Sequence, residues 1–141
     1  MIINKTCIIT GGVLIVADHM VVFHSRFYKL FNWKKDFERI TLRNQKIFYT
    51  IHIALLLFFL VFTFLSFVYV NELSQCKGLA FSIVISYSLF WLWRAIWQLI
   101  YFNPKKSNSS KKLVFLHYFL IIIFLALFVV YFIPVLSKLS L

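Results

Sequence analysis

The sequence predicts an all-α fold, in the form of a four-helix transmembrane bundle with up-down topology. Hydrophobic residues make up 62% of the 141 residues and charged residues only 13%, whereas about a quarter of the residues in a soluble domain are charged. Four apolar segments reach the roughly 20 residues that a helix needs to cross a bilayer. The basic residues are concentrated in the short connections between these segments, a pattern typical of membrane proteins.

The four apolar segments are expected to be helices because they are too long for strands and show no strand-like alternation. They lie between Lys5 and Arg26 and at Ile47–Val70, Leu79–Phe102 and Leu113–Ser137. The expected helices cover residues 6–28, 47–70, 79–102 and 113–137, within one integral membrane domain that spans residues 1–141. A cleaved signal peptide is the alternative for the first segment, but Asp18 and His19 stand where a small-residue cleavage site would be.

The connections predict an orientation. Basic residues fill the connections Arg26–Lys46 and Asn103–Lys112, whereas Asn71–Gly78 holds only Lys77, balanced by Glu72. Because cytoplasmic connections are enriched in Lys and Arg, both termini and the middle connection are expected outside the cytoplasm. Frequent Phe, Ile, Lys and Asn suggest an AT-rich bacterial genome, so the expected location is a bacterial inner membrane. The net charge of +11 is divided among short segments, so nucleic acid is not an expected partner.

The first basic connection has a helical pattern of its own. Leu30, Trp33, Phe37 and Ile40 recur at helical spacing, with charged residues between them. This pattern favours a short interfacial amphipathic helix in the headgroup layer, between the first and second membrane helices. The alternative is that the first membrane helix simply continues into the cytoplasm. Short connections also make consecutive helices antiparallel neighbours.

Polar residues in the four segments gather at one depth. At a rise of about 1.5 Å per residue, all the strongly polar residues fall in the cytoplasmic half. A binding pocket is therefore expected there, formed by Asp18, His19, His52, Arg94, Gln98 and His117. Asp18 and Arg94 are the opposite charges within the segments, and pairing would offset their desolvation. The alternative is that Arg94 reaches the headgroups and Asp18 is protonated.

Small and aromatic residues predict which helix faces pack. Gly11 and Gly12 permit close approach of a neighbouring helix to the first segment. Trp91, Trp93 and Trp97 point to successive sides of the third helix, so that some of them must face lipid.

The sequence offers no recognisable catalytic set. It lacks a glycine-rich phosphate loop, a nucleophile elbow and an HExxH pattern, so no catalytic residue is assigned and an enzyme is not favoured. The two cysteines, Cys7 and Cys76, form no CxxC pair, so neither a metal nor another cofactor is expected. Both cysteines are expected at the outer face, where a disulfide is permitted but not required. A haem held by His52 and His117 as axial ligands is the alternative.

The leading hypothesis is a non-enzymatic integral membrane protein that binds a lipid or a partner subunit through the polar pocket. Arg94 would hold an anionic headgroup or an acidic partner group, and Asp18 would orient it. Membrane lipids are therefore expected partners, together with another membrane protein or a second copy in a homo-oligomer. The alternatives are a redox or quinone-linked membrane subunit with the haem above, and a small proton-coupled transporter acting through Asp18, His19 and Arg94.

Several short motifs resemble those of an uncharacterised group of small bacterial four-helix membrane proteins. The matching residues are Trp33 in the first basic connection, the triplet Arg43-Asn44-Gln45, an FWxxRxxxQ stretch that runs from Phe90 and Trp91 through Arg94 to Gln98, and His117 early in the fourth helix. The triplet has an altered order here, because the group carries Asn-Arg-Gln or a similar triplet. The resemblance implies the four-helix membrane architecture and an important role for Arg94, and it implies no reaction.

Overall fold

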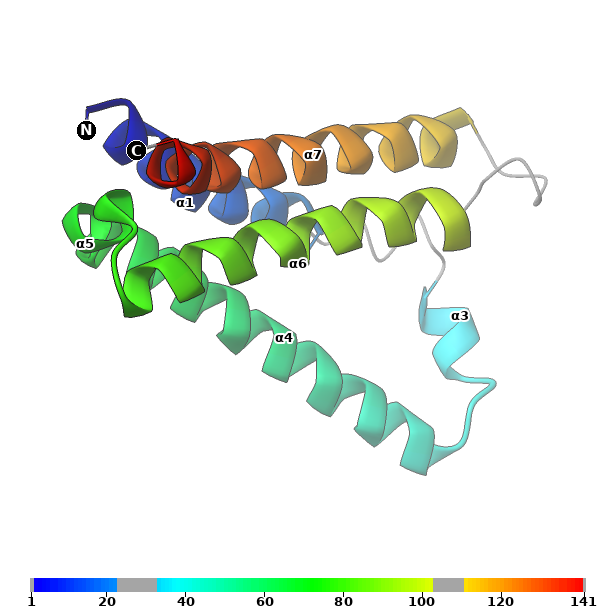
Figure 1. Cartoon of the computed structure of the whole chain (residues 1–141). Coiled ribbons are helices and arrows are strands. Elements are labelled where there is room, and N and C mark those ends of the chain that lie inside the picture. Colours follow the sequence, from blue (N-terminus) through cyan, green and yellow to red (C-terminus); the bar gives the residue numbers. More distant parts are fainter. Residues whose placement is uncertain (1, 23–32, 103–110, 141) are drawn as a thin grey trace.

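The computed structural model describes residues 2–22, 33–102 and 111–140, and within these ranges the chain forms helices and no strand. The helices are α1 (Ile2–Val22), α3 (Trp33–Phe37), α4 (Leu42–Val68), α5 (Val70–Gln75), α6 (Leu79–Tyr101) and α7 (Lys111–Leu139). Four of them, α1, α4, α6 and α7, are long and apolar enough to cross a membrane. They alternate in direction and pack together (Figure 1), which confirms the predicted all-α four-helix bundle.

The two ends of the bundle differ in character. The terminal end carries both chain termini and α5, whereas the basic end carries α3 and the start of α4 (Figure 1).

Three of the long helices begin earlier than expected, at Ile2, Leu42 and Lys111. The expected end of the first helix near residue 28 and the turn expected between Pro104 and Ser110 lie outside the described residues.

Thr41 sets the early start of α4. Its backbone is extended, its side-chain oxygen accepts a hydrogen bond from the Asn44 amide at 3.4 Å, and its carbonyl accepts one from the Gln45 amide at 3.0 Å. Threonine is a favoured residue at this capping position because it satisfies an amide that has no partner within the helix. As a result Arg43 and Lys46 belong to the helix and not to the connection before it.

The middle connection folds into a helix that the sequence did not predict. The helix α5 begins after Tyr69 and ends at Cys76, which adopts a left-handed conformation with φ 47°. Leu73, Ser74 and Cys76 are buried, so the connection packs against the bundle. Both cysteines are free thiols in the structure, and burial raises the pKa of the Cys76 thiol, which favours an inert thiol.

Helix α1 packs against α7, α4 and α5, and two glycines bring it close to its neighbours. A side-chain carbon placed on Gly11 would lie 2.5 Å from the Tyr131 ring of α7, and one on Gly12 would lie 3.1 Å from the Phe67 ring of α4. The expectation of close approach at these glycines is therefore confirmed. Asn4 holds the terminal end together, because its side chain donates to the Ser74 carbonyl and accepts from the Ser137 hydroxyl, both at 3.2 Å.

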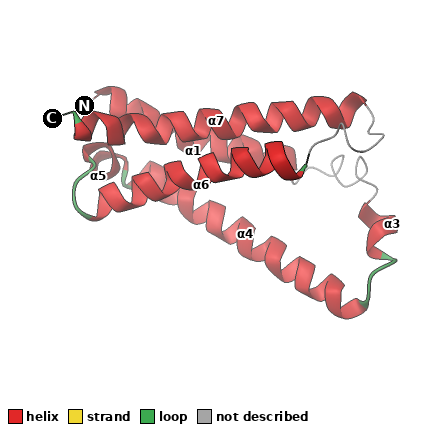
Figure 2. Ribbon diagram, turned by 45° about the vertical axis from the view of Figure 1, so that its right-hand side comes forward, coloured by secondary structure: helices red, strands yellow, loops and turns green. Residues whose placement is uncertain are grey.

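Helix α4 diverges from the rest of the bundle at the basic end. Figures 1 and 2 show its C-terminal half against the other helices and its N-terminal half splayed away from α6 and α7. Burial follows this geometry: Phe62 is 7% exposed, whereas Leu55, on the same face two turns earlier, is 44% exposed. One half of α4 is therefore packed in the bundle core, and the inward face of the other half is uncovered.

The short helix α3 is anchored to the start of α4. Trp33 and Phe37 each meet the Phe48 ring edge-on, with ring centroids 5.6 and 5.0 Å apart. The Gln45 side chain donates to the carbonyls of Phe37 at 2.8 Å and Ile40 at 3.2 Å. A separate helix thus exists where an amphipathic one was expected, but it ends at Phe37, so Ile40 lies in the following turn. Leu30 lies outside the described residues.

Candidate functional site

The structure brings the charges of Asp18 and Arg94 near each other. Asp18 lies in the last turns of α1 and is 5% exposed, whereas Arg94 lies in the C-terminal third of α6 and is half-buried. The two charges interact electrostatically, but no direct ion pair joins them. The Arg94 guanidinium carbon instead lies 5.1 Å from the centre of the Phe124 ring on α7, within cation–π range.

Both charged groups retain unused hydrogen-bonding capacity. Oxygen Oδ1 of Asp18 is buried and has no hydrogen-bond partner in the part of the chain that the structure describes. Over the same ranges, no acceptor lies within hydrogen-bond distance of the Arg94 guanidinium. Buried charges in proteins are normally paired and hydrogen-bonded. This arrangement is therefore one that a bound polar group or water would complete.

Two further polar groups face the core from the same side of α6. Trp91 is fully buried between the rings of Phe59 and Phe124, which stack on it at centroid distances of 5.5 and 5.7 Å. Its indole nitrogen has no partner among the described residues, and neither has the hydroxyl of Tyr87, one turn earlier. Tyr87, Trp91 and Arg94 thus form one stripe of polar groups without hydrogen-bond partners.

Gln98 and His117 form a separate polar contact nearer the basic end. Both are buried, and Gln98 Nε2 lies 3.4 Å from His117 Nδ1. This contact joins α6 to α7. Tyr101, which continues the same sequence stripe as Gln98, is exposed, because α6 ends there and no helix covers it.

The remaining two predicted site residues have different neighbours. His19 Nδ1 lies 2.8 Å from the Ile15 carbonyl, and its ring meets the Phe59 ring of α4 edge-on at 4.5 Å. His52 lies on the splayed half of α4 and packs near Trp33 and Phe48. Five of the six predicted residues thus lie on α1, α6 and α7, where Asp18 is near Arg94 and Gln98 contacts His117, and His52 lies on α4.

The two histidines considered for haem ligation are not brought face to face. His52 belongs to the half of α4 that diverges from α7 (Figure 2), whereas His117 contacts Gln98. Within the described ranges, no three His, Cys, Asp or Glu side chains form a group that could hold a metal ion.

Sequence reasoning missed a polar contact near the terminal end. The hydroxyl of Tyr131 lies 2.7 Å from that of Ser66, which also donates to the Phe62 carbonyl at 2.8 Å. Residue spacing gives no signal for this contact, because it joins two helices that are far apart in the sequence. By contrast, Trp93 and Trp97 are exposed while Trp91 is buried, as expected for tryptophans on successive sides of one helix.

Four apolar helices of spanning length, packed around a core with a few enclosed polar groups, define this chain as an integral membrane protein of the all-α class. No family model, curated protein or solved structure matches it. The resemblance to the FWxxRxxxQ group therefore stays a prediction, and the function has to be inferred from the site itself.

Proposed function

We propose that the protein is a non-enzymatic integral membrane protein that binds an anionic lipid headgroup through Arg94. One observation carries this proposal: a half-buried guanidinium inside a candidate membrane span has no hydrogen-bond acceptor among the described residues. An ionisable residue within a span is costly and usually serves a ligand or a partner. Asp18 would orient the guanidinium by charge without occupying its donors.

The chemistry of the site suits an oxyanion. A guanidinium presents a planar set of donors that matches phosphate and carboxylate geometry, and such charge-assisted hydrogen bonds are strong. The buried indole nitrogen of Trp91, on the same stripe of α6, offers a further donor. A carboxylate from a partner subunit would have the same chemistry, and the experiment below distinguishes it from a lipid.

The distribution of charge supports an orientation with both termini outside the cytoplasm of a bacterial inner membrane. The basic end carries Lys34, Lys35, Arg39, Arg43, Lys46, Lys111 and Lys112, and the terminal end carries only Lys5, Lys77 and Lys138 with Glu72. Basic residues mark the cytoplasmic side, where anionic lipids also attract them. A reporter active only outside the cytoplasm should be active after Leu141 and silent after Asn108. The reverse pattern would contradict this orientation.

The lipid proposal is tested by the stability of the purified protein with defined lipids. Phosphatidylglycerol, added to protein in a neutral detergent, should raise the thermal-aggregation midpoint more than phosphatidylcholine does, because a ligand that binds the folded state stabilises it. The variant Arg94→Gln should diminish this difference. Lys112→Gln, which removes an exposed charge at the start of α7, is the matched control and should keep it.

Two outcomes would overturn the lipid proposal. One is an undiminished preference for phosphatidylglycerol in Arg94→Gln. The other is the absence of any lipid preference together with a membrane protein that co-purifies with the wild type and not with Arg94→Gln, which would assign the site to a partner subunit.

A further inference from the structure

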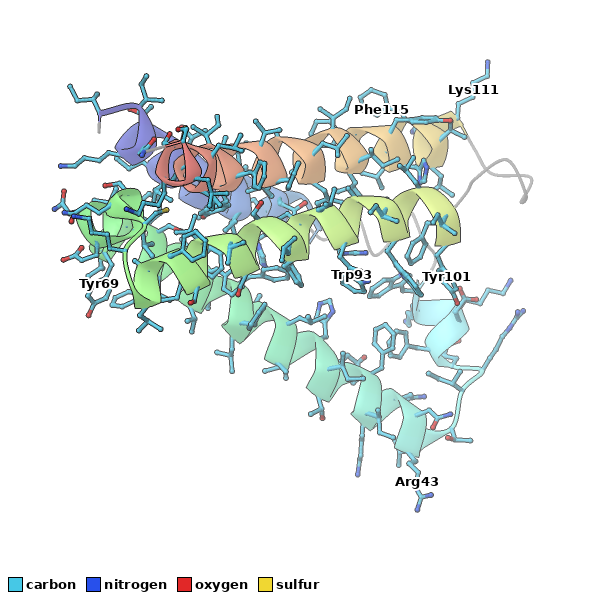
Figure 3. The ribbon with its side chains drawn as sticks, viewed as in Figure 1. Arg43, Tyr69, Trp93, Tyr101, Lys111 and Phe115 are labelled. Carbon is cyan, nitrogen blue, oxygen red and sulfur yellow. The ribbon has the colours of Figure 1, made fainter. Side chains whose placement is uncertain are left out.

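A second apolar surface lies between α6 and the splayed half of α4. On α6 it consists of Trp93, Trp97 and Tyr101, whose rings stack in sequence at centroid distances of 5.9 and 5.1 Å. Figure 3 shows Trp93 and Tyr101 on the side of α6 that faces α4 and α3. Trp93 and Trp97 are 52% and 42% exposed, although the buried residues Trp91, Ala95 and Gln98 lie beside them on α6. We call these three rings the α6 wall.

The opposite wall belongs to α4. Phe48, Leu55 and Phe58 lie along its inward side and are exposed; we call them the α4 wall. The two helices meet where Phe58 and Phe59 contact Phe90, at centroid distances of 5.8 and 5.9 Å. Between that contact and the basic end, no ring contact joins α4 to α6 in the described chain. The two walls therefore meet at Phe90 and are separated at the basic end. We call this separated end the mouth.

The composition of the walls argues against a packed helix as their occupant. Helices pack closely in membranes through small residues, as α1 does at Gly11 and Gly12. The walls instead present large rings and a leucine. Flexible acyl chains adapt to such a surface, whereas a rigid helix would find no groove in it.

The mouth lies at the end of the molecule that is rich in basic residues. Exposed basic residues on α3 and the start of α4 are Lys34, Lys35, Arg39, Arg43 and Lys46; of these, Figure 3 shows Arg43 on the side of α4 that faces away from α6. Two exposed acidic residues, Asp36 and Glu38, offset only part of this charge. Basic clusters at a membrane surface attract anionic headgroups. The apolar walls and the basic mouth thus match the two parts of one anionic phospholipid.

We propose that an anionic phospholipid occupies this opening, with its acyl chains between the α4 and α6 walls and its headgroup on the basic residues of α3 and α4. This site uses other contacts than those of Arg94, whose guanidinium lies over the Phe124 ring of α7 and interacts with the charge of Asp18 on α1. Neither proposal requires the other.

The test measures quenching of Trp97 by phospholipids with brominated acyl chains. Trp33→Phe with Trp93→Phe leaves Trp97 and the buried Trp91 as fluorophores. In phosphatidylcholine vesicles with a minor fraction of brominated lipid, brominated phosphatidylglycerol should quench roughly twofold more than brominated phosphatidylcholine at the same content. Adding Trp97→Phe leaves only Trp91, whose signal with each lipid is subtracted to give the quenching of Trp97 itself.

Charge variants show which basic residues cause the stronger quenching by brominated phosphatidylglycerol. Lys34→Gln, Lys35→Gln and Arg39→Gln together should abolish it. Lys5→Gln, Lys77→Gln and Lys138→Gln, at the terminal end, form the matched control and should retain it. Arg94→Gln should retain it as well, which separates this site from the proposed function.

Three results would overturn this inference. Equal quenching by the two brominated lipids would mean that the opening holds only bulk lipid, and a preference that survives the α3 variant would place the anionic lipid elsewhere. If neither lipid quenches Trp97 and the protein is a dimer in detergent, a second copy covers the walls instead.

Discussion

The hydroxyl groups of Ser66 and Tyr131 lie 2.7 Å apart, and this buried hydrogen bond joins α4 to α7. It sits beside Gly11 of α1, whose missing side chain makes room for the Tyr131 ring. The stacked pair of Phe62 and Tyr87, with centroids 3.7 Å apart, packs against the same ring. Tyr131 is therefore the point where all four long helices meet.

Removing this hydroxyl should destabilise the bundle modestly. Tyr131→Phe keeps the ring and loses the hydrogen bond, while Ser66 retains its bond to the Phe62 carbonyl. A hydrogen bond between helices in a membrane contributes about 0.6 kcal/mol on average, so a coupling energy of that order is expected between Tyr131→Phe and Ser66→Ala. Thermal-aggregation midpoints of the two single variants and the double variant measure it. Fully additive shifts would show that the two hydroxyls do not interact.

Gly11→Ala should be more damaging than Gly12→Ala. The added carbon would lie within 2.8 Å of three Tyr131 atoms at Gly11 but no nearer than 3.1 Å to any neighbour at Gly12. Overpacking a core typically costs about 1–3 kcal/mol, which exceeds the roughly 1 kcal/mol that alanine gains over glycine in a helix. Unfolding in mixed micelles should therefore rank the wild type above Gly11→Ala, with Gly12→Ala between them or near the wild type. The opposite order of the two variants would refute the contact.

The charges of Asp18 and Arg94 should depend on each other. Arg94→Ala leaves Asp18 buried without the charge that offsets its desolvation, whereas Asp18→Asn with Arg94→Gln removes both charges. Breaking a buried pair from one side costs about 3–5 kcal/mol, and a smaller loss is expected here because no direct ion pair exists. The double variant should be more stable than Arg94→Ala when aggregation midpoints in detergent are compared. If the effects of the two sites simply add, the charges do not interact.

Gln45→Ala should release α3 without unfolding the bundle. The variant loses two side-chain hydrogen bonds to the carbonyls of Phe37 and Ile40, each worth about 1 kcal/mol. Both hydrogen bonds join the start of α4 to α3 and the turn after it, outside the bundle core. Limited trypsin digestion at Lys34 and Lys35 should accelerate several-fold while the thermal midpoint changes little. Asn44→Ala is the control, because only the backbone amide of Asn44 takes part in the cap. Equal digestion rates for the two variants would contradict this role of Gln45.

Composition and charge placement were sufficient to predict the four spans, because length and hydropathy define a helix that can cross a bilayer. Two local features were not predictable in this way. Helix α5 contains Asn71, Glu72 and Ser74 and reads as a polar connection, yet it folds against α1. The divergence of α4 could not be predicted from the sequence either. Leu55 and Phe62 share one face of α4, and periodicity identifies such a face without telling whether another helix covers it.

Only part of the candidate site could be anticipated from the sequence. Counting residues along the helices put Asp18 and Arg94 at one level, and in the structure the two side chains are near enough for an electrostatic interaction but form no ion pair. The missing direct contact depends on small rotations of α1 and α6, which no sequence pattern specifies. Gln98 and His117 were both placed in the predicted pocket and contact each other, whereas the hydrogen bond between Ser66 and Tyr131 was not predicted.

The contacts of α1 have a consequence for the order in which the protein is made. One of its partners is α7, which contacts it through Tyr131 at Gly11 and Ser137 at Asn4. Helix α1 leaves the ribosome before α7, so it must wait in the membrane until α7 has been synthesised. A chain that stops before α7 leaves Gly11 uncovered and the Asn4 side-chain oxygen without its hydrogen bond from Ser137, so the packing of α1 is completed only when α7 arrives.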